Sequence, residues 1–330
     1  MPPVKLAADD ARWLAAAAAL AERARPLSCP NPGVGAIIVQ GGVLVGRGWT
    51  QPGGRPHAEA IALAQAGEAA RGGTLYVTLE PCAHQSQRGP ACADLVAASG
   101  LAKVVVGMAD PDPRTAGQGA SRLRESGIQV EVAGSDPAEL RLSGHTCALA
   151  LGRPHITLKL ALSLDGCIAL ASGESQWITG AAARAHTHRE RARADAILVG
   201  GGTIRADLPR LDVRLPGLED RSLERWVLTR GDAPNGWHHL TSPQDLGAMA
   251  HLRYLLIEGG AGAAAAFLRA DLVDRLLIYR APIIIGGGRP GVGDIGLGEL
   301  ADAHGRWLMT DSRQLGSDRL EVYQRGERGI

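Results

Sequence analysis

Aromatic residues make up only 3% of the 330 residues, and the chain contains a single phenylalanine. The formal net charge of +1 leaves no excess of basic residues that would hold a nucleic acid by bulk charge. Proteins that bind single strands combine a positively charged groove with aromatic side chains on which bases stack. Because both signals are weak in this sequence, we expect no nucleic-acid partner.

Long apolar runs are also lacking, since no stretch approaches the roughly 20 residues that a transmembrane helix needs. The apolar run over residues 15–20 is short, and no cleavage-like site follows it, which argues against a secretory signal. We therefore expect a cytoplasmic chain without a membrane partner. Its five cysteines are an odd number, which argues against a disulfide framework. Cysteines in a reducing compartment are candidate metal ligands.

The length of the chain is sufficient for two domains, each with its own core. In the first half, the pattern predicts helices over 7–24, 57–66, 92–98 and 119–126, and strands over 34–39, 43–48, 74–79, 103–107 and 128–132. A similar series restarts after residue 154, with strands over 155–161, 196–199, 225–229, 254–257 and 275–279, and helices over 181–192 and 262–270. Alternating strands and helices predict two α/β domains, over 1–150 and 151–330.

A histidine and two cysteines of the first half form a candidate zinc site. His57, Cys82 and Cys92 can supply three ligands of a tetrahedral Zn²⁺ and leave the fourth position to water, as a catalytic zinc requires. Glu59 follows the histidine on the same predicted helix, where it can carry a proton from water to a leaving amine. His-x-Glu followed by Pro-Cys and a second cysteine is typical of zinc deaminases. The alternatives are buried packing cysteines and a structural zinc with a fourth protein ligand.

The spacing of the cysteines narrows this interpretation. Nine residues separate Cys82 from Cys92, where generic zinc deaminases have two. With this longer loop, the motifs Asn31-Pro-Gly-Val-Gly35, His57-Ala-Glu59, Thr78-Leu-Glu-Pro-Cys-Ala-His84 and Asp110-Pro-Asp-Pro113 resemble the deaminase half of the bifunctional deaminase–reductase family of riboflavin biosynthesis. The loop is one residue longer than usual in the family, and its usual Gly-Arg-Thr-Pro-Pro is altered.

The resemblance implies a cytidine-deaminase-like three-layer α/β/α domain that deaminates a phosphoribosylated diaminopyrimidinone. Carried over by position, Asn31 and His84 would contact this substrate. Asn31 also has a simpler interpretation as a turn residue before Pro32. The three remaining cysteines match no ligand position and are interpreted as packing residues: Cys29, Cys147 and Cys167.

Glycines dominate the junctions between strands and helices in the second half, as at Glu258-Gly-Gly-Ala-Gly262. Such a turn lets backbone amides approach a phosphate, and the start of the following helix favours an anion. Gly260, Gly262 and Ala265 also fit a loose Gly-x-Gly-x-x-Ala pattern, but no acidic residue follows about twenty positions later, as the dinucleotide fingerprint requires. The sequence therefore does not favour a Rossmann fold. It favours a pyrophosphate-binding turn within another type of α/β fold.

Three segments of this half, around 159–179, 195–214 and 256–262, resemble the reductase half of the same family. The resemblance implies a dihydrofolate-reductase-like α/β domain that uses NADPH to reduce the ribose of the deaminated product. It places these residues along NADPH: Ala161, Trp177, Thr203, Asp207, Gly260, Ala261, Gly262, Ala263, Ala264, Ala265 and Ala266. It places these residues on the substrate: Ser175, Arg191, Leu211, Arg214 and Glu258. The two arginines are suited to its phosphate.

Lys159 and Asp165 lie where a catalytic pair could polarise the sugar, although a surface ion pair explains them equally well. Two departures from the family pattern fall nearby: Ala206-Asp207-Leu208-Pro209 has lost one carboxylate, and the stretch 230–251 is shortened. A cofactor-contacting serine is also replaced around Thr229-Arg230.

The sequence thus predicts a two-step enzyme, a homo-oligomer acting on a small molecule, with one Zn²⁺ per chain and NADPH. Two alternatives remain open. The second half could have lost reduction and serve as a binding or assembly module. A nucleic-acid deaminase would need a basic channel and stacking aromatic residues.

Overall fold

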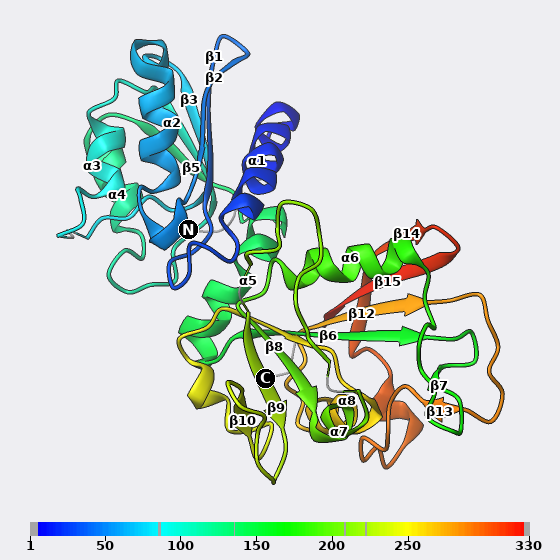
Figure 1. The fold of residues 1–330 in the computed structure, drawn as a ribbon. Helices are drawn as coiled ribbons and strands as arrows, with labels where there is room; N and C mark the ends of the chain where they lie inside the picture. Colours follow the sequence, from blue (N-terminus) through cyan, green and yellow to red (C-terminus); the bar gives the residue numbers. More distant parts are fainter. Residues whose placement is uncertain (1–5, 85–86, 135, 208, 222, 327–330) are drawn as a thin grey trace. The chain divides into compact units, whose positions relative to one another are not determined.

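The computed structural model describes residues 6–84, 87–134, 136–207, 209–221 and 223–326. Contacts divide the chain into two compact units, Met1–Gly152 and Arg153–Ile330, each with its own sheet (Figure 1). Each unit is described by itself below. Among the described residues, no helix combines the length and the apolarity that crossing a membrane requires.

The first unit is built on a five-stranded sheet in the order β2-β1-β3-β4-β5. Its strands are β1 (Gly35–Gln40), β2 (Val43–Trp49), β3 (Thr74–Leu79), β4 (Lys103–Met108) and β5 (Gln129–Val132). β1 pairs antiparallel with β2 and β3, whereas β3, β4 and β5 are parallel. All the residues of β3 after Thr74 are buried. A strand buried on both faces is expected where helices cover the whole sheet.

Helices cover both faces of this sheet. On one face, Leu14 of α1 (Ala8–Ala21) packs with Ile37 and Val105. On the other face, α2 (Ala58–Ala66), α3 (Cys92–Ala97) and α4 (Gln118–Glu125) pack with Ile38 and its neighbours. The predicted three-layer α/β/α arrangement is confirmed.

The helix that carries the histidine of the candidate zinc site lies directly against β2. A Cβ atom at Gly48 would lie 2.3 Å from the carbonyl oxygen of Ala58, and one at Gly46 would lie 2.3 Å from that of Ala62. Only glycine leaves room for so close a helix, because any side chain would overlap the helix backbone. Two glycines of β2 therefore set the height of α2, and with it the position of its first residues, above the sheet.

The second unit contains an eight-stranded sheet in the order β10-β9-β8-β11-β6-β12-β15-β14. The six strands from one edge to β12 are parallel, namely β10 (His238–Leu240), β9 (Glu224–Leu228), β8 (Ala196–Gly200), β11 (Tyr254–Ile257), β6 (His155–Leu162) and β12 (Arg275–Arg280). The hairpin of β14 (Trp307–Leu315) and β15 (Asp318–Arg325) completes the sheet in antiparallel pairing. A separate small sheet pairs β7 (Cys167–Ala169) with β13 (Arg289–Pro290).

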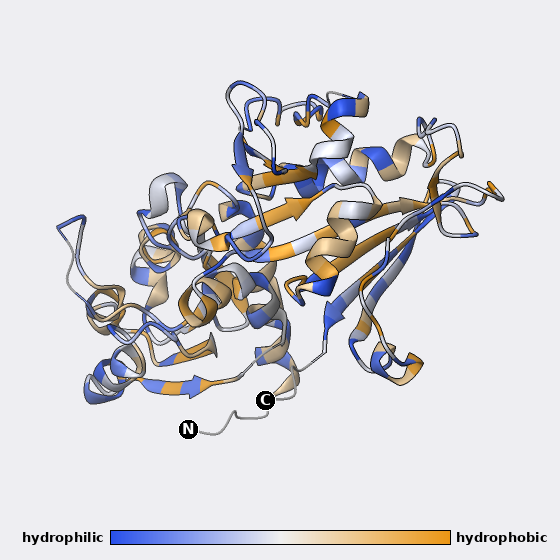
Figure 2. Cartoon of the chain, turned by 90° about the horizontal axis from the view of Figure 1, so that it is seen from below, coloured by the Kyte–Doolittle hydropathy of each residue, from blue (hydrophilic) through white to orange (hydrophobic). Residues whose placement is uncertain are grey.

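Two helices of this unit begin at the carboxyl ends of neighbouring strands. α7 (Gly201–Asp207) follows β8 directly, and α8 (Ala261–Arg269) follows β11. A further helix, α6 (Ala181–Arg191), packs against β15. Figure 2 shows runs of apolar residues along several strands and hydrophilic residues in many of the connecting loops. In open α/β sheets, ligands bind outside the carboxyl ends of the strands, which directs attention to the starts of α7 and α8.

The predicted elements are present, and their ends differ from the prediction by at most three residues. The sequence did not predict α5 (Asp136–Leu151), the short α7 or the β14–β15 hairpin. α5 contains the polar stretch Ser143-Gly-His-Thr146, which interrupts the apolar spacing of a helix. β14 is an edge strand with mostly exposed or half-buried residues, so it lacks the alternation by which strands are recognised. The structure divides the chain two residues after the predicted boundary.

Candidate metal centre and reductase pocket

Three elements of the first unit bring the predicted zinc ligands together. His57 is the N-cap of α2, Cys82 lies after the end of β3, and Cys92 is the first residue of α3. Their ligand atoms all lie within 4.8 Å of one another. The Nδ1 atom of His57 is 3.3 Å from the Sγ atom of Cys92 and 3.6 Å from that of Cys82.

These distances fit a zinc ion. Zinc–sulfur bonds of about 2.3 Å and zinc–nitrogen bonds of about 2.0–2.1 Å in a tetrahedron put a nitrogen and a sulfur ligand about 3.6 Å apart. Two thiolates and one imidazole are also a donor set that zinc prefers. Among the described residues, this is the one cluster of at least three such groups that could hold a metal ion. Three protein ligands leave a position for water, as in a catalytic site rather than a structural one.

Glu59 lies in the first turn of α2, two residues after the histidine, and its side chain is only 3% exposed. Burial raises the pKa of its carboxyl group, and the nearby charge of His57 opposes this shift. A hydrogen bond also links the carboxyl group to the Cys92 thiol. A buried carboxyl group with a raised pKa is suited to taking up and passing on a proton.

The two cysteines differ in their affinity for protons. A hydrogen bond from the Cys92 side chain, supported by His57, lowers the pKa of Cys82. The same hydrogen bond, together with burial, raises the pKa of Cys92. In addition, the backbone N–H of Cys92 donates to the Sγ atom of Cys82 at 3.4 Å. The start of α3 therefore stabilises a thiolate at Cys82, which is the form that ligates a metal.

Glu80, which the sequence analysis did not single out, holds the cysteine loop in place. Its carboxylate is 3% exposed and accepts backbone N–H bonds from Asp110 at 3.2 Å, Gly117 at 3.0 Å and Ala120 at 2.9 Å. It thereby ties the loop before Cys82 to the loop after β4 and to the start of α4. An acidic residue directly before Pro-Cys was the available signal for this role.

The two predicted substrate residues of this half have protein partners. The side-chain amide of Asn31 donates to the carbonyl of Gly54 at 3.1 Å. His84 lies 3.5 Å from the hydroxyl of the buried Thr115, measured from its Nδ1 atom. Neither residue lines the cleft described next. Their contact with the substrate therefore stays a prediction from the family resemblance.

A cleft of about 440 Å³ opens beside the metal ligands and is lined by His57, Cys92 and two arginines. Arg55 donates to the carbonyl of Pro90 at 3.3 Å, and Arg88 donates to that of Gly53 at 2.7 Å. Each arginine thus reaches from its own loop to the backbone of the other. No acidic residue lines this cleft within the described part of the chain. Its walls therefore favour an anionic group beside the metal site.

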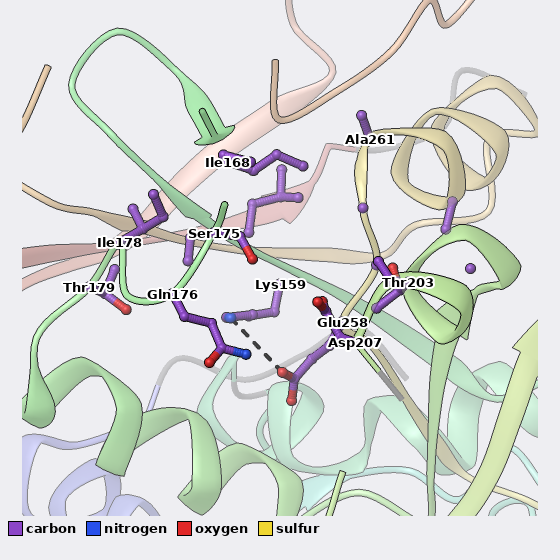
Figure 3. A pocket seen from close by; sticks show the side chains of 18 of the residues that line it. Lys159, Ile168, Ser175, Gln176, Ile178, Thr179, Thr203, Asp207, Glu258 and Ala261 are labelled. Carbon is purple, nitrogen blue, oxygen red and sulfur yellow. Dashed lines mark ion pairs between the residues drawn. The ribbon is translucent and has the colours of Figure 1, made fainter. Parts of the chain in front are cut away.

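The second unit contains a larger cavity, of about 730 Å³, at the carboxyl ends of β6, β8 and β11 (Figure 3). Eight of the predicted NADPH residues line it: Ala161, Trp177, Thr203, Asp207, Gly260, Ala261, Gly262 and Ala263. The other three, Ala264, Ala265 and Ala266, lie further along α8 and do not line it.

The turn before α8 fits a dinucleotide phosphate. Gly260 is the N-cap of the helix, whose first turn has no acidic residue, so its free N–H groups favour an anion. A Cβ atom at Gly260 would lie 3.6 Å from the hydroxyl of Thr203, and one at Gly259 would lie 2.7 Å from the Cβ atom of Ala263. Because glycine has no side chain, the backbone at Gly259 and Gly260 is open to the cavity between the starts of α7 and α8.

Charged side chains meet at the centre of this cavity. Glu258 accepts two hydrogen bonds from Arg191, at 2.6 and 2.8 Å, and lies 3.9 Å from the Nζ atom of Lys159, an ion pair drawn in Figure 3. Burial lowers the pKa of Lys159. Burial also opposes ionisation of Glu258, but Arg191 outweighs it and keeps the pKa of Glu258 below its ordinary value. Of the predicted substrate residues, Ser175, Arg191, Arg214 and Glu258 line the cavity.

Two expectations for this region need revision. The predicted partner of Lys159 was Asp165, but Asp165 is absent from the cavity wall. Its carboxylate instead accepts the hydroxyl of Ser163 at 2.5 Å and the backbone N–H groups of Ile285 and Gly286. Leu211 does not line the cavity either, because it is buried in the core next to Ile197 and Val199. The actual partner, Glu258, lies too far along the chain for a local pattern to reveal the pairing.

Comparison with known sequences agrees with this division of the chain. The cytidine and deoxycytidylate deaminase zinc-binding region matches residues 7–108, and the RibD C-terminal domain matches residues 154–237 and 243–320. The riboflavin biosynthesis protein RibD of Escherichia coli is 36% identical, over 94% of this chain and 98% of that protein. That of Mycobacterium tuberculosis is 40% identical, over 88% of this chain and 90% of its own. The chain belongs to the RibD family.

Solved structures of the RibD family share the fold. RibD of Acinetobacter baumannii is 35% identical, with a TM-score of 0.83 over 97% of this chain and 99% of that chain. A deaminase/reductase of Thermotoga maritima is 28% identical, also with a TM-score of 0.83, over 96% and 99% of the two chains. The predicted fold class, a cytidine-deaminase-like domain followed by a reductase domain of this family, is confirmed.

Membership of the RibD family also settles what kind of enzyme this is. It is a bifunctional deaminase and reductase of riboflavin biosynthesis, because both domains are present in one chain. The alternative of a deaminase with a degenerate second half is therefore not favoured. The cofactors are zinc for the deaminase domain and NADPH for the reductase domain, as predicted. Its partner is a small-molecule substrate.

Proposed function

We propose that the first unit deaminates a diaminohydroxyphosphoribosylaminopyrimidine and that the second unit reduces the resulting 5-amino-6-(5-phosphoribosylamino)uracil. These compounds are the ones named for the related enzyme of Thermotoga maritima. The observation that carries the proposal is that one chain holds both the His57–Cys82–Cys92 cluster and the cavity around Lys159 and Glu258. Each site has the groups that its half-reaction needs.

In the deamination, His57, Cys82 and Cys92 would hold the zinc ion. Zinc supplies Lewis acidity, which lowers the pKa of a water molecule at its open position. Glu59 would carry a proton from water to the amino group, which would leave as ammonia while the oxygen of that water becomes the ring carbonyl. Its burial supports this role because a carboxyl group with a raised pKa binds a proton readily. Asn31 and His84 would orient the pyrimidine.

The phosphate of the deaminase substrate would bind at Arg55 and Arg88. Both line the cleft beside the metal ligands, and none of the described residues that line this cleft is acidic. Arginine pairs phosphate oxygens in bidentate fashion. The loop between the cysteines, although it differs from the usual family sequence, would therefore hold the substrate through the positive charge of Arg88.

In the reduction, the starts of α7 and α8 would hold NADPH, with its phosphates at Gly260, Ala261 and Gly262. The predicted contacts to the cofactor also include Ala161, Trp177, Thr203, Asp207 and the stretch 263–266. NADPH supplies the hydride. Lys159 holds a proton at Nζ that the opening sugar ring can take up, and its lowered pKa favours release of that proton. Ser175, Arg191, Arg214 and Glu258, which line this cavity, would form the substrate side of the site.

Separate assays of the two half-reactions test this proposal. Ammonia release from the diaminopyrimidine without NADPH measures the first unit, and NADPH oxidation with the phosphoribosylamino-uracil measures the second. We expect turnover in both assays. Folded, zinc-loaded protein that fails in either assay would overturn the assignment of that unit.

We further propose that the enzyme acts in the cytoplasm as a homo-oligomer. Support for association comes from β14, an edge strand of the second sheet, on which Leu308 and Met309 are 60% and 58% exposed. Exposed apolar edge strands are ready to pair with another chain. Light scattering is expected to give more than one chain per particle. A monomer at assay concentration would contradict the oligomer.

A further inference from the structure

His188 lies in the wall of the reductase cavity, and neither the sequence motifs nor the proposed reaction gives it a role. It occupies α6 one turn before Arg191, and its side chain is half-buried. It lines the cavity together with Arg214 and Glu258. A histidine among residues proposed to hold the substrate needs an explanation.

The imidazole of His188 binds the backbone of the segment that carries Arg214. Its Nδ1 atom accepts the backbone N–H of Arg214 at 3.2 Å, while Arg191 donates through Nη1 to the carbonyl of Asp212 at 2.9 Å. Positions 188 and 191 lie on the same face of a helix. One face of α6 therefore forms hydrogen bonds with the backbone of this segment at two residues, Asp212 and Arg214.

The segment needs this attachment because of its own conformation. Leu211 adopts a positive φ of 53°, which is uncommon for a residue with a side chain. Leu211 and Val213 are buried at 5% and 3% exposure, whereas Arg214 is exposed and lines the cavity. The ion pair between Arg214 and Asp212, at 3.3 Å, is partly exposed and contributes little. The hydrogen bond to His188 therefore holds the backbone N–H of Arg214 itself, next to the buried Val213.

Arg214 is also the arginine with more donors to offer to a ligand. Arg191 uses Nε and Nη2 on Glu258 and Nη1 on the carbonyl of Asp212. Among the described residues, the guanidinium group of Arg214 contacts only Asp212, through Nε. A phosphate in this cavity would thus depend mainly on where Arg214 is held.

We propose that His188 is a positioning residue for Arg214: by accepting its backbone N–H, the imidazole keeps the guanidinium group over the cavity, where it binds the substrate phosphate. The proposal rests on the function proposed above, in which Arg214 is a phosphate contact. His188 itself does not touch the reacting atoms.

The protonation state of His188 follows from this arrangement, since Nδ1 accepts a hydrogen bond only while it carries no proton. The charged groups that face the imidazole are Arg191 from α6, Arg214 and Asp212 from the attached segment, and Glu258 after β11. Burial, then the two guanidinium groups, lower the pKa of His188, and they outweigh Glu258 and a hydrogen bond to the backbone of Asp212, which both raise it. The positioning contact is therefore present at neutral pH and lost in acid.

The test compares His188→Asn, whose side-chain oxygen can replace Nδ1 as acceptor, with His188→Leu, which has none. Steady-state NADPH oxidation is measured with the phosphorylated uracil and with its dephosphorylated analogue, and Arg214→Ala serves as the reference. We expect His188→Leu to raise KM for the phosphorylated substrate about fivefold to tenfold, the worth of one hydrogen bond, with kcat nearly unchanged. His188→Asn is expected to restore most of the affinity.

Three further measurements distinguish a positioning role of His188 from a merely structural role. With the dephosphorylated analogue, KM should be the same for the wild type, His188→Asn and His188→Leu. The double variant His188→Leu/Arg214→Ala should be no worse than Arg214→Ala alone, because both changes remove one contact. On acidification, KM should rise more steeply in the wild type than in His188→Asn, which does not titrate, although the substrate phosphate titrates equally in both.

Either of two results would overturn the inference. One is unchanged KM in a folded His188→Leu variant, and the other is an equal loss with both substrates. If His188→Leu does not fold, the comparison of His188→Asn with the wild type across pH decides the question, and identical profiles would refute it. Absence of NADPH oxidation in the wild type would instead refute the proposed function itself.

Discussion

At the scale of single residues, burial determines what Glu59 can do. A carboxyl group that is 3% exposed is poorly stabilised as an ion by solvent, so its pKa rises and uptake of a proton beside the metal ligands is favoured. The amide of a glutamine has the same shape but no exchangeable carboxyl proton. The difference between the two side chains therefore isolates proton transfer.

Glu59→Gln is expected to lower ammonia release by about 10² to 10⁴-fold, the usual worth of a general acid–base group. Zinc content and NADPH oxidation with the uracil substrate should not change. The measurement is ammonia release alongside metal analysis of the same preparation. Unchanged deamination would remove Glu59 from the mechanism.

Cys92→Ser tests the ligand set at the same scale. Serine keeps the size of the side chain but removes the soft sulfur ligand, so zinc content is expected to fall well below one ion per chain. Cys147→Ser is the matched control, because Cys147 is outside the cluster and should leave zinc unchanged. Full zinc occupancy in the Cys92 variant would show that the ligands are misassigned.

At the scale of elements, Glu80 connects the end of β3 with the start of α4. Its three backbone N–H donors would lose an anionic acceptor in Glu80→Gln. We expect a loss of about 1–3 kcal/mol in unfolding free energy, since hydrogen bonds to charged groups are the stronger ones. Urea denaturation of the zinc-loaded chain measures this change, with the exposed Glu68→Gln as control. Equal stability of both variants would contradict the role of Glu80.

A buried histidine makes the attachment of α6 sensitive to pH. The Nδ1 atom of His186 lies 2.7 Å from the hydroxyl of Tyr279, and its Nε2 atom accepts from Arg189 at 2.8 Å. Burial, opposed by Glu190 but aided by Arg189, Arg313 and Arg275, lowers its pKa to about 4.

The pKa of His186 in the folded protein lies below its value near 6.5 in the unfolded chain. At a pH between these two values, unfolding is therefore accompanied by uptake of a proton. Stability is therefore complete above about pH 6.5, falls as the pH drops towards 4, and changes no further below that. After allowance for solvent screening, we expect a loss on the order of 1–2 kcal/mol. Melting curves of the wild type and His186→Gln should converge in acid. Parallel curves across this range would contradict the assignment.

The elements also show which parts of the site a sequence can reveal. The zinc ligands were predictable because His57 and Glu59 share one helical turn and the cysteines follow a strand in a known order. The pairing of Lys159 with Glu258 was not, because it depends on the parallel register of β6 and β11, which no local pattern specifies. The same holds for Arg55 and Arg88, whose loops meet only in the folded unit. Asp165 was misjudged because backbone amides satisfy it more than 100 residues away.

At the scale of the whole molecule, each unit has its own core and its own complete set of reactive groups. Loss of one site should therefore leave the other intact. Glu59→Gln is expected to retain reduction, and Lys159→Met is expected to retain deamination. A mixture of the two variants should convert the diaminopyrimidine to the reduced product, whereas each variant alone should not. A mixture that remains inactive would show that both sites must work in one chain.

The most direct test of the two-step account is the stoichiometry of the complete reaction. Zinc-loaded wild-type protein is supplied with the diaminopyrimidine substrate and excess NADPH, and ammonia and oxidised cofactor are measured together. The account predicts one ammonia released and one NADPH oxidised for each substrate consumed, with oxidation lagging behind ammonia release. Ammonia release without any oxidation of NADPH would contradict it, because the second unit would then not be a reductase.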